Sequence, residues 1–513
     1  MIAIEINEAS FEYDIHSLVK AFFPKEEVHI FTKDQKEGVA FKHGSTNGHA
    51  LQKEDGLTLN IEFTATPPEG QEHLGQCNDR IFIALCDPLK ETSKTVSVDF
   101  TDRRQTKNKL KQALYQVLRE NTNRELPWGT LTGIRPTKIP MAFLEQGKSK
   151  SEIKQYMADT YFASTSKIEL SIAVAERELN LLKQLDFYDG YSLYIGIPFC
   201  PSTCLYCSFT SYPLAKWVGQ VEEYLTALER EIDFVSNAYK GKYVNTIYIG
   251  GGTPTTLLPE QLERLFAKIE QCFDLSKLLE YTVEAGRPDS ISREKLKVLK
   301  KHHISRISIN PQTMKQATLD FVGRNHTVEQ TTESFILARE LGFDQINMDL
   351  IVGLPQETPD DIANTMEQLK PLDPDSITVH SLAIKRASRL RMLQEENPDF
   401  GQANIGEMME LTAKYAREMG HVPYYLYRQK NMAGNFENVG YAKPGKEGIY
   451  NILMMEEKQS IIALGAGAIT KFVFAHGTQI ERIDNVKDIT NYLERIDEMV
   501  ERKKTAFKAY RAR

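Results

Sequence analysis

The chain contains little cysteine, almost no tryptophan and no long apolar run. Six cysteines in 513 residues are too few for a disulfide scaffold. No segment approaches the roughly 18 to 20 consecutive apolar residues of a membrane-spanning helix. The first residues also lack the basic and apolar regions of a secretory signal. We therefore expect a cytoplasmic protein with reduced thiols and no membrane partner.

An excess of positive charge is also missing. The formal net charge is -7 and the isoelectric point is near 6.0. This balance argues against a surface that binds nucleic acid throughout, so no nucleic-acid partner is expected. With 41% hydrophobic and 26% charged residues, the composition is that of an ordinary globular protein.

The pattern along the chain changes three times and predicts four segments. Residues 1–125 combine short alternating strands with a helix, which predicts an α+β domain. Residues 126–188 start with a Gly- and Pro-rich stretch and continue with helical spacing, as in a helical connector. Residues 189–390 alternate strands and helices, and residues 391–513 form a mixed C-terminal domain that we expect to cover or bind a substrate.

The third segment contains six β/α repeats. Its apolar strands are predicted at 191–199, 244–251, 279–286, 304–312, 345–355 and 376–383. Helices of this length between buried strands predict an α/β fold with parallel crossovers. A doubly wound open sheet and a partial (β/α)6 barrel both fit, and both place their chemistry at the carboxyl ends of the strands.

Three cysteines lie within eight positions, directly after the first of these strands. Cys200, Cys204 and Cys207 have the spacing CxxxCxxC, and no second cysteine pair exists to complete a four-ligand site. Three thiolates from one loop can hold three irons of a 4Fe-4S cluster and leave the fourth iron open. The alternatives are three reduced structural thiols and, more remotely, a zinc-stabilised binding module.

This motif, with Tyr206 just before the last cysteine, resembles that of the radical S-adenosylmethionine (SAM) superfamily. Within it, residues from about 190 to 475 are most similar to the oxygen-independent coproporphyrinogen III oxidase (dehydrogenase) family. The leading domain and the WGTLTGIRPTK stretch resemble the long, Gram-positive-type branch of that family. The resemblance implies a partial (β/α)6 radical SAM barrel, with a 4Fe-4S cluster on the three cysteines and SAM on the open iron.

The resemblance also implies the positions that bind the cofactor. Tyr194 corresponds to a SAM-contacting tyrosine, and Gly251, Gly252 and Thr253 correspond to the turn that meets the methionine amino group. An ordinary Gly-rich turn is the alternative for GGGTPT, and a helix cap or turn is the alternative for an aspartate at a strand end. The remaining implied positions are Tyr206, Glu284, Gln312, Arg324, Asp349, Ala383 and Ile469. Arg324 is suited to clamp a carboxylate by bidentate hydrogen bonds.

The implied reaction is the oxidative decarboxylation of coproporphyrinogen III to protoporphyrinogen IX in heme biosynthesis, without dioxygen. The cluster and SAM generate the radical, so no catalytic side chain is implied. A reduced ferredoxin or flavodoxin is the expected electron donor, and no oligomeric state is predicted. Because the porphyrinogen substrate carries four carboxylates, we expect cations near it, with Arg135, Lys385, Arg386 and Arg428 as candidates.

One position departs from a well-known branch of the family. Phe209 stands where that branch has a fourth cysteine. A phenylalanine there also occurs in the related heme-trafficking branch, so a heme chaperone of the same fold is the alternative function. His380, which adjoins the sixth strand, is a candidate heme or substrate ligand. The extra N-terminal domain favours the dehydrogenase branch, by analogy of domains alone.

Overall fold

The computed structural model describes residues 1–32, 57–65, 79–87, 90–185, 190–383, 389–390, 392, 404–429, 435–474 and 479–511. The chain forms two compact units. Unit 1 comprises Met1–Ala173 and Arg428–Glu437, and unit 2 comprises Val174–Tyr427 and Asn438–Arg513. Among the helices of the described ranges, none is both long enough and apolar enough to cross a membrane.

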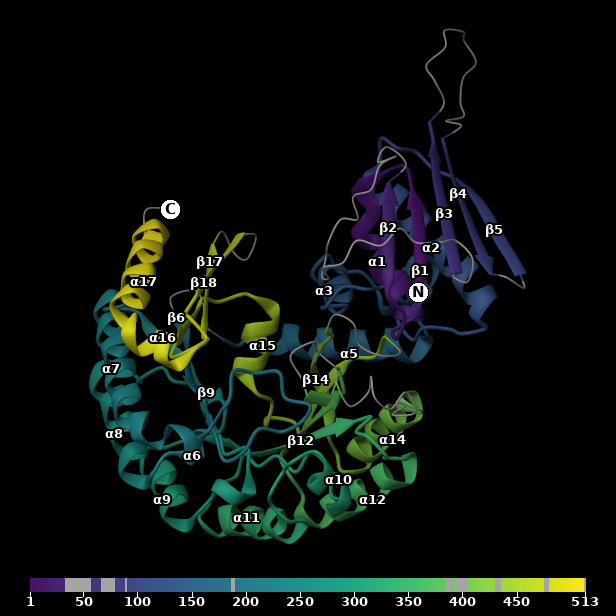
Figure 1. Ribbon diagram of the computed structural model, residues 1–513. Coiled ribbons are helices and arrows are strands. Elements are labelled where there is room, and N and C mark those ends of the chain that lie inside the picture. Colours follow the sequence, from purple (N-terminus) through teal and green to yellow (C-terminus); the bar gives the residue numbers. More distant parts are fainter. Residues whose placement is uncertain are drawn as a thin grey trace. The chain divides into compact units, whose positions relative to one another are not determined.

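Unit 1 is built on a five-stranded sheet of order β2-β1-β3-β4-β5 (Figure 1). Its strands are β1 (Ile2–Ile6), β2 (Val28–Thr32), β3 (Leu57–Thr64), β4 (Arg80–Asp87) and β5 (Lys90–Ser97). Its helices are α1 (Glu12–Phe22), α2 (Arg103–Thr122), α3 (Lys138–Glu145), α4 (Lys150–Tyr161) and the first part of α5 (Thr165–Leu182). Alternate residues of β1 are buried under α1 and α2, as the period of two in IAIEI predicts.

Unit 2 contains the six predicted β/α repeats. The strands are β6 (Gly190–Ile197), β9 (Tyr243–Gly251), β10 (Glu280–Glu284), β11 (Arg306–Ser308), β12 (Ile346–Val352) and β13 (Ser376–Ser381). The helices between them are α6 (Leu214–Trp217), α7 (Val221–Ala238), α8 (Pro259–Cys272), α9 (Arg293–Lys301), α10 (Gln316–Phe321), α11 (Val328–Glu340) and α12 (Pro359–Leu369). In Figure 1 the longer helices form an outer row along the curved sheet.

The order of these strands decides between the two candidate architectures. The six strands are parallel and lie side by side in chain order, from β6 to β13. A doubly wound sheet reverses its strand order at a switch point, whereas a barrel wall is wound in one direction. The prediction of a partial (β/α)6 barrel is therefore confirmed.

The rest of unit 2 extends the sheet at both edges. On one edge β16 (Ile461–Leu464) pairs in parallel with β6 and leads to β17 (Ile469–Phe474) and β18 (Gln479–Asp484). On the other edge β15 (Asn438–Ala442) pairs antiparallel with β13 and is followed by β14 (Val422–Tyr427). The helices of this part are α14 (Ile405–Glu418), α15 (Ile449–Glu456), α16 (Ile489–Glu494) and α17 (Ile496–Arg511).

Candidate active site

The cysteine loop lies at the carboxyl end of β6. It begins at β7 (Phe199–Cys200) and is closed by β8 (Tyr212–Pro213), which pairs with β7 in parallel. The loop is anchored to the segment after α10, because the Leu205 amide donates to Val322 O at 3.0 Å and Ser202 Oγ donates to Gly323 O at 2.9 Å. Buried apolar residues pack behind it, where they exclude water: Val322, Ile351, Leu354, Leu382 and Leu390, with Leu205, Tyr206 and Phe321 against them.

Each of the three thiols has a polar neighbour. Thr253 Oγ1 donates to Cys200 Sγ at 3.4 Å, a guanidinium nitrogen of Arg287 lies 3.8 Å from Cys204 Sγ, and Ser211 Oγ lies 3.8 Å from Cys207 Sγ. Burial raises the pKa of the Cys200 thiol to about 11, and the negative charges of the other two thiolates act in the same direction. The Cys200 thiol therefore needs a cation to deprotonate it at neutral pH.

The three cysteines are not arranged around a single point. Within the described ranges, no group of three or more His, Cys, Asp and Glu side chains is placed to hold one metal ion. A cubane cluster does not require the three sulfurs to meet at one point, because each thiolate binds its own iron. Three cysteines of one loop with hydroxyl and guanidinium donors at their sulfurs fit such a cluster chemically.

The GGGT turn after β9 lies against the start of this loop. The Gly252 amide donates to Ile197 O and the Thr253 amide to Phe199 O, both at 2.7 Å. Gly251 has φ +106°, and a Cβ atom at Gly252 would come within 2.6 Å of Phe199 O. Glycine is thus required because two backbones meet, which explains this part of the motif without a ligand. The SAM contacts of the turn remain a prediction.

Glu284 ends β10 and is half-buried beside the same turn. Its carboxylate accepts a hydrogen bond from Tyr248 OH. A Cβ atom added at Gly250 would lie only 2.8 Å from this carboxylate. Burial raises the pKa of Glu284 to about 7, although the bond from Tyr248 acts in the opposite direction. Tyr194 on β6 lies close by, with its ring centroid 6.3 Å from that of Tyr248.

Arg324 follows α10 in the chain and contacts Tyr206 of the cysteine loop. One terminal nitrogen donates to Tyr206 OH at 3.2 Å, and the other donates to Gly286 O at 3.0 Å and Asn310 O at 2.7 Å. Its Nε is buried and has no hydrogen-bond partner among the described residues. The protein itself thus uses both terminal nitrogens to hold Arg324 in place, whereas the N–H group at Nε is not used by the described residues.

Two other implied cofactor positions belong to the next strands: Gln312 lies four residues after the end of β11, and Asp349 lies in the middle of β12 rather than at its end. Gln312 has φ +69° and is bridged to Leu350 of β12 by backbone bonds. Asp349 of β12 accepts from Asn347 Nδ2 at 2.7 Å and lies 3.8 Å from His380 Nε2. Burial alone would raise the pKa of Asp349, but His380 and Asn347 outweigh it and hold that pKa below its usual value.

Ala383 and Ile469 lie at the two sides of this row of strands. Ala383 is half-buried just after β13. Ile469 begins β17 after the turn from β16, and its side chain is 44% exposed. The roles of all these positions toward SAM stay predictions.

The candidate substrate cations have different surroundings. In unit 1, Arg428 is buried and donates to the carbonyl oxygens of Leu131, Gly133, Asn435 and Phe436, at 2.7 to 3.4 Å. That geometry is typical of an arginine that links backbone segments, a structural tie, rather than of a cation that binds a ligand. Arg135 is half-buried in the same unit. Lys385 and Arg386 lie outside the described residues.

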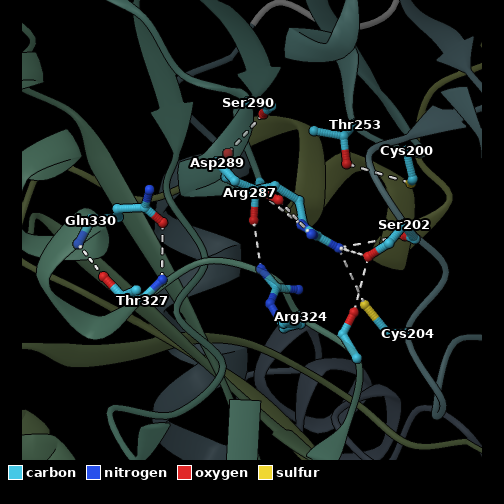
Figure 2. Close-up of polar contacts among 12 residues, drawn as sticks. Cys200, Ser202, Cys204, Thr253, Arg287, Asp289, Ser290, Arg324, Thr327 and Gln330 are labelled. Atoms are coloured by element: carbon cyan, nitrogen blue, oxygen red, sulfur yellow. Dashed lines mark hydrogen bonds and ion pairs between the residues drawn. The ribbon is translucent and has the colours of Figure 1, made fainter. Parts of the chain in front are cut away.

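Two charged residues near the cysteines were missed by sequence reasoning. Arg287 and Asp289 follow β10 in the run GRPDS; Arg287 reaches the cysteine loop, and Asp289 pairs with Arg287 (Figure 2). The available signal was an arginine and an aspartate three and five residues after Glu284, at a strand end where polar side chains gather.

Three comparisons place this geometry among known proteins. Residues 194–369 match the model of the radical SAM superfamily. The oxygen-independent coproporphyrinogen-III oxidase-like protein HemZ of Bacillus subtilis is 41% identical over 421 residues, 81% of this chain and 84% of the relative. The heme chaperone HemW of Bacillus subtilis is 33% identical over 308 residues, 60% of this chain and 76% of the relative.

The solved structure of coproporphyrinogen III oxidase HemN from Escherichia coli is similar in fold. It aligns with a TM-score of 0.50 and 23% identity, and the alignment covers 63% of this chain and 73% of that one. At this identity the likeness concerns the fold alone.

Proposed function

Because this chain belongs to the radical SAM superfamily and, within it, to the family of oxygen-independent coproporphyrinogen III oxidases and their relatives, we propose that it decarboxylates coproporphyrinogen III. The product would be protoporphyrinogen IX, formed without dioxygen. One observation carries the proposal: the three-cysteine loop and the GGGT turn are joined by hydrogen bonds at the carboxyl ends of β6 and β9. The 41% identity to an oxidase-like relative supports the reaction class.

Superfamily membership implies a 4Fe-4S cluster and SAM, and this chain offers residues for both. Cys200, Cys204 and Cys207 would hold the cluster. When bound, the cluster and SAM supply hydrogen-atom abstraction by a carbon radical, which is cofactor chemistry. For SAM, the backbone of the turn at Gly251 would leave room for the methionine end, and Glu284 would accept a hydrogen bond from a cationic donor. The unpartnered Nε of Arg324 would serve an anionic group.

The protein would also keep the site dry and oriented. The apolar residues behind the cysteine loop shield it from water, which strengthens every electrostatic interaction there. Tyr206 is fixed by Arg324 and in turn packs against these residues. A porphyrinogen would be the substrate and a reduced ferredoxin or flavodoxin the electron donor.

An anaerobic assay tests the proposal. The reconstituted chain is incubated with coproporphyrinogen III, SAM and a reductant, and mass spectrometry follows the loss of two carbon dioxide molecules per substrate. We expect product from the unaltered chain and none from Cys207→Ala. Cluster assembly and SAM cleavage without decarboxylation of this substrate would contradict the proposal and leave the family assignment standing.

A heme chaperone is the second candidate. It is favoured by the 33% identity to HemW and by Phe209, which lies in the cysteine loop two residues after Cys207 and is 72% exposed. An exposed aromatic ring of this kind suits contact with a flat apolar ligand. Stoichiometric heme binding and transfer to an apo-acceptor, without porphyrinogen turnover, would support this function instead.

A further inference from the structure

Arg287 connects the segment after β10 to the cysteine loop. The residue is only 3% exposed. Its Nε and one terminal nitrogen donate to the two carboxylate oxygens of Asp289, at 2.9 and 2.6 Å. The other terminal nitrogen lies 3.0 Å from Ser202 Oγ and 3.8 Å from Cys204 Sγ (Figure 2). One planar group thus joins a carboxylate to a thiol.

The contacts around Arg287 hold it in this orientation. A bidentate pair with a carboxylate fixes the plane of a guanidinium group. Burial would raise the pKa of Asp289, but the hydrogen bonds and charge of Arg287 outweigh burial and keep that pKa below its usual value, so the partner stays ionised. Ser202 is held in turn by its bond to Gly323 O at 2.9 Å.

Cys204 differs from the other two cysteines in the nature of its neighbour. Cys200 and Cys207 have the neutral hydroxyl groups of Thr253 and Ser211 at their sulfurs. Cys204 interacts with the Tyr206 hydroxyl and, in addition, has a fixed, permanently charged cation at its sulfur. Hydrogen bonds and charges at ligating sulfurs are among the factors that set the reduction potential of an iron–sulfur cluster.

We propose that Arg287 is a positioning residue that raises the reduction potential of the cluster through the thiolate of Cys204. This inference rests on the proposed function in one respect, since it takes the three thiolates as cluster ligands. Reduction transfers one electron from an external donor to the cluster and breaks no bond in the chain. The added negative charge is favoured by a nearby fixed cation in buried surroundings, so the guanidinium stabilises the reduced state more than the oxidised one.

The test is a redox titration of the full-length reconstituted protein, followed by electron paramagnetic resonance. Arg287→Gln removes the cation and keeps a polar side chain. We expect the midpoint potential to become more negative, by about a tenfold change in the ratio of reduced to oxidised cluster at fixed potential, or about 59 mV for one electron. Arg293→Gln is the matched control. It removes an exposed arginine that pairs with Glu340 at 2.9 Å, and it should leave the potential unchanged.

An unchanged midpoint in Arg287→Gln, with full iron and sulfide content, would overturn the inference. Should that variant fail to retain a cluster, Arg287→Lys decides. Lysine keeps the charge but cannot span Asp289 and Cys204 with one planar group, so a smaller shift in the same direction is expected and a wild-type potential would refute the role. If the unaltered chain decarboxylates coproporphyrinogen III but Arg287→Gln leaves the midpoint potential unchanged, only this inference is contradicted. If Arg287→Gln shifts the midpoint potential but the unaltered chain does not decarboxylate the substrate, only the proposed reaction is contradicted.

Discussion

At the scale of single residues, burial changes what a side chain can do. Glu284 is a carboxyl group whose pKa burial raises to about 7, so it exchanges its proton near neutral pH. Asp349 is half-buried, yet its neighbours hold its pKa below the usual value and keep it ionised. Glu284 ends β10 as the sequence predicted, whereas Asp349 lies in the middle of β12 and not at its end. Their different protonation depends on neighbours from other strands, which the sequence pattern did not reveal.

The affinity for SAM should depend on pH through Glu284. SAM carries positive charge, so it should bind the ionised carboxylate, and ionisation is lost as the pH falls through about 7. Affinity should therefore be constant above about pH 8 and fall about tenfold per pH unit below 7. Glu284→Gln should bind about 10- to 100-fold more weakly at pH 8 and show no such pH dependence.

Anaerobic calorimetry between pH 6 and 8.5 measures this effect. Glu263→Gln, at the surface of α8, is the control that should retain the wild-type profile. A Glu284→Gln variant with an undiminished pH dependence would show that another group is responsible.

At the scale of elements, the C-terminal helix α17 is joined to α7 by a buried ionic network. Lys503 Nζ contacts Glu231 Oε1 at 2.5 Å and Asn485 Oδ1 at 2.6 Å. Glu231 also accepts from Tyr492 OH at 2.6 Å and from the Gly465 amide at 2.7 Å. Since Gly465 begins the turn at the carboxyl end of β16, the network holds that turn beside β6. The sequence pattern predicted a mixed C-terminal domain over residues 391–513, but not the partners that anchor α17.

Removing one member of this network should be costly. Lys503→Met leaves the Glu231 carboxylate buried without its cation, and we expect unit 2 to lose about 3 to 5 kcal/mol of stability. Arg230→Gln is a matched control, because Arg230 and Asp497 also join α7 to α17 but are exposed. That control should cost about 0 to 1 kcal/mol. Denaturant unfolding, with hydrogen exchange of α17 amides, measures both. Equal losses would contradict the prediction.

At the scale of the whole molecule, chain order and structural units do not coincide. Residues 428–437 come between β14 and β15 of unit 2, yet they belong to unit 1. Within unit 1, Trp128 Nε1 donates to Glu437 Oε2 at 2.8 Å, and Lys167 Nζ contacts Glu437 Oε1 at 2.5 Å. Each of the four segments predicted from the pattern is one continuous stretch of the chain. Unit 1, in contrast, is made of two stretches that are far apart in the sequence.

Trp128→Phe tests how residues 428–437 are held. The variant keeps most of the buried aromatic volume but removes the N–H donor, so one oxygen of the buried Glu437 loses its partner. We expect a cost of about 1 to 3 kcal/mol and faster hydrogen exchange around residues 435–437. Trp217→Phe, which retains an aromatic ring against Tyr212, should not change exchange there. Unchanged protection in Trp128→Phe would mean that other contacts hold this segment.

The sequence by itself determined the six strands and their helices, the cysteine loop and the family resemblance. These features depend on residues that are neighbours in the chain, through hydrophobic periodicity and ligand spacing. Only the tertiary structure decided that the strands lie in chain order, that Arg428 is a structural tie, and that Arg287 meets Cys204 across 83 positions. Such contacts arise from the pairing of the whole sheet, in which distant strand ends meet at one edge, and no local pattern encodes them.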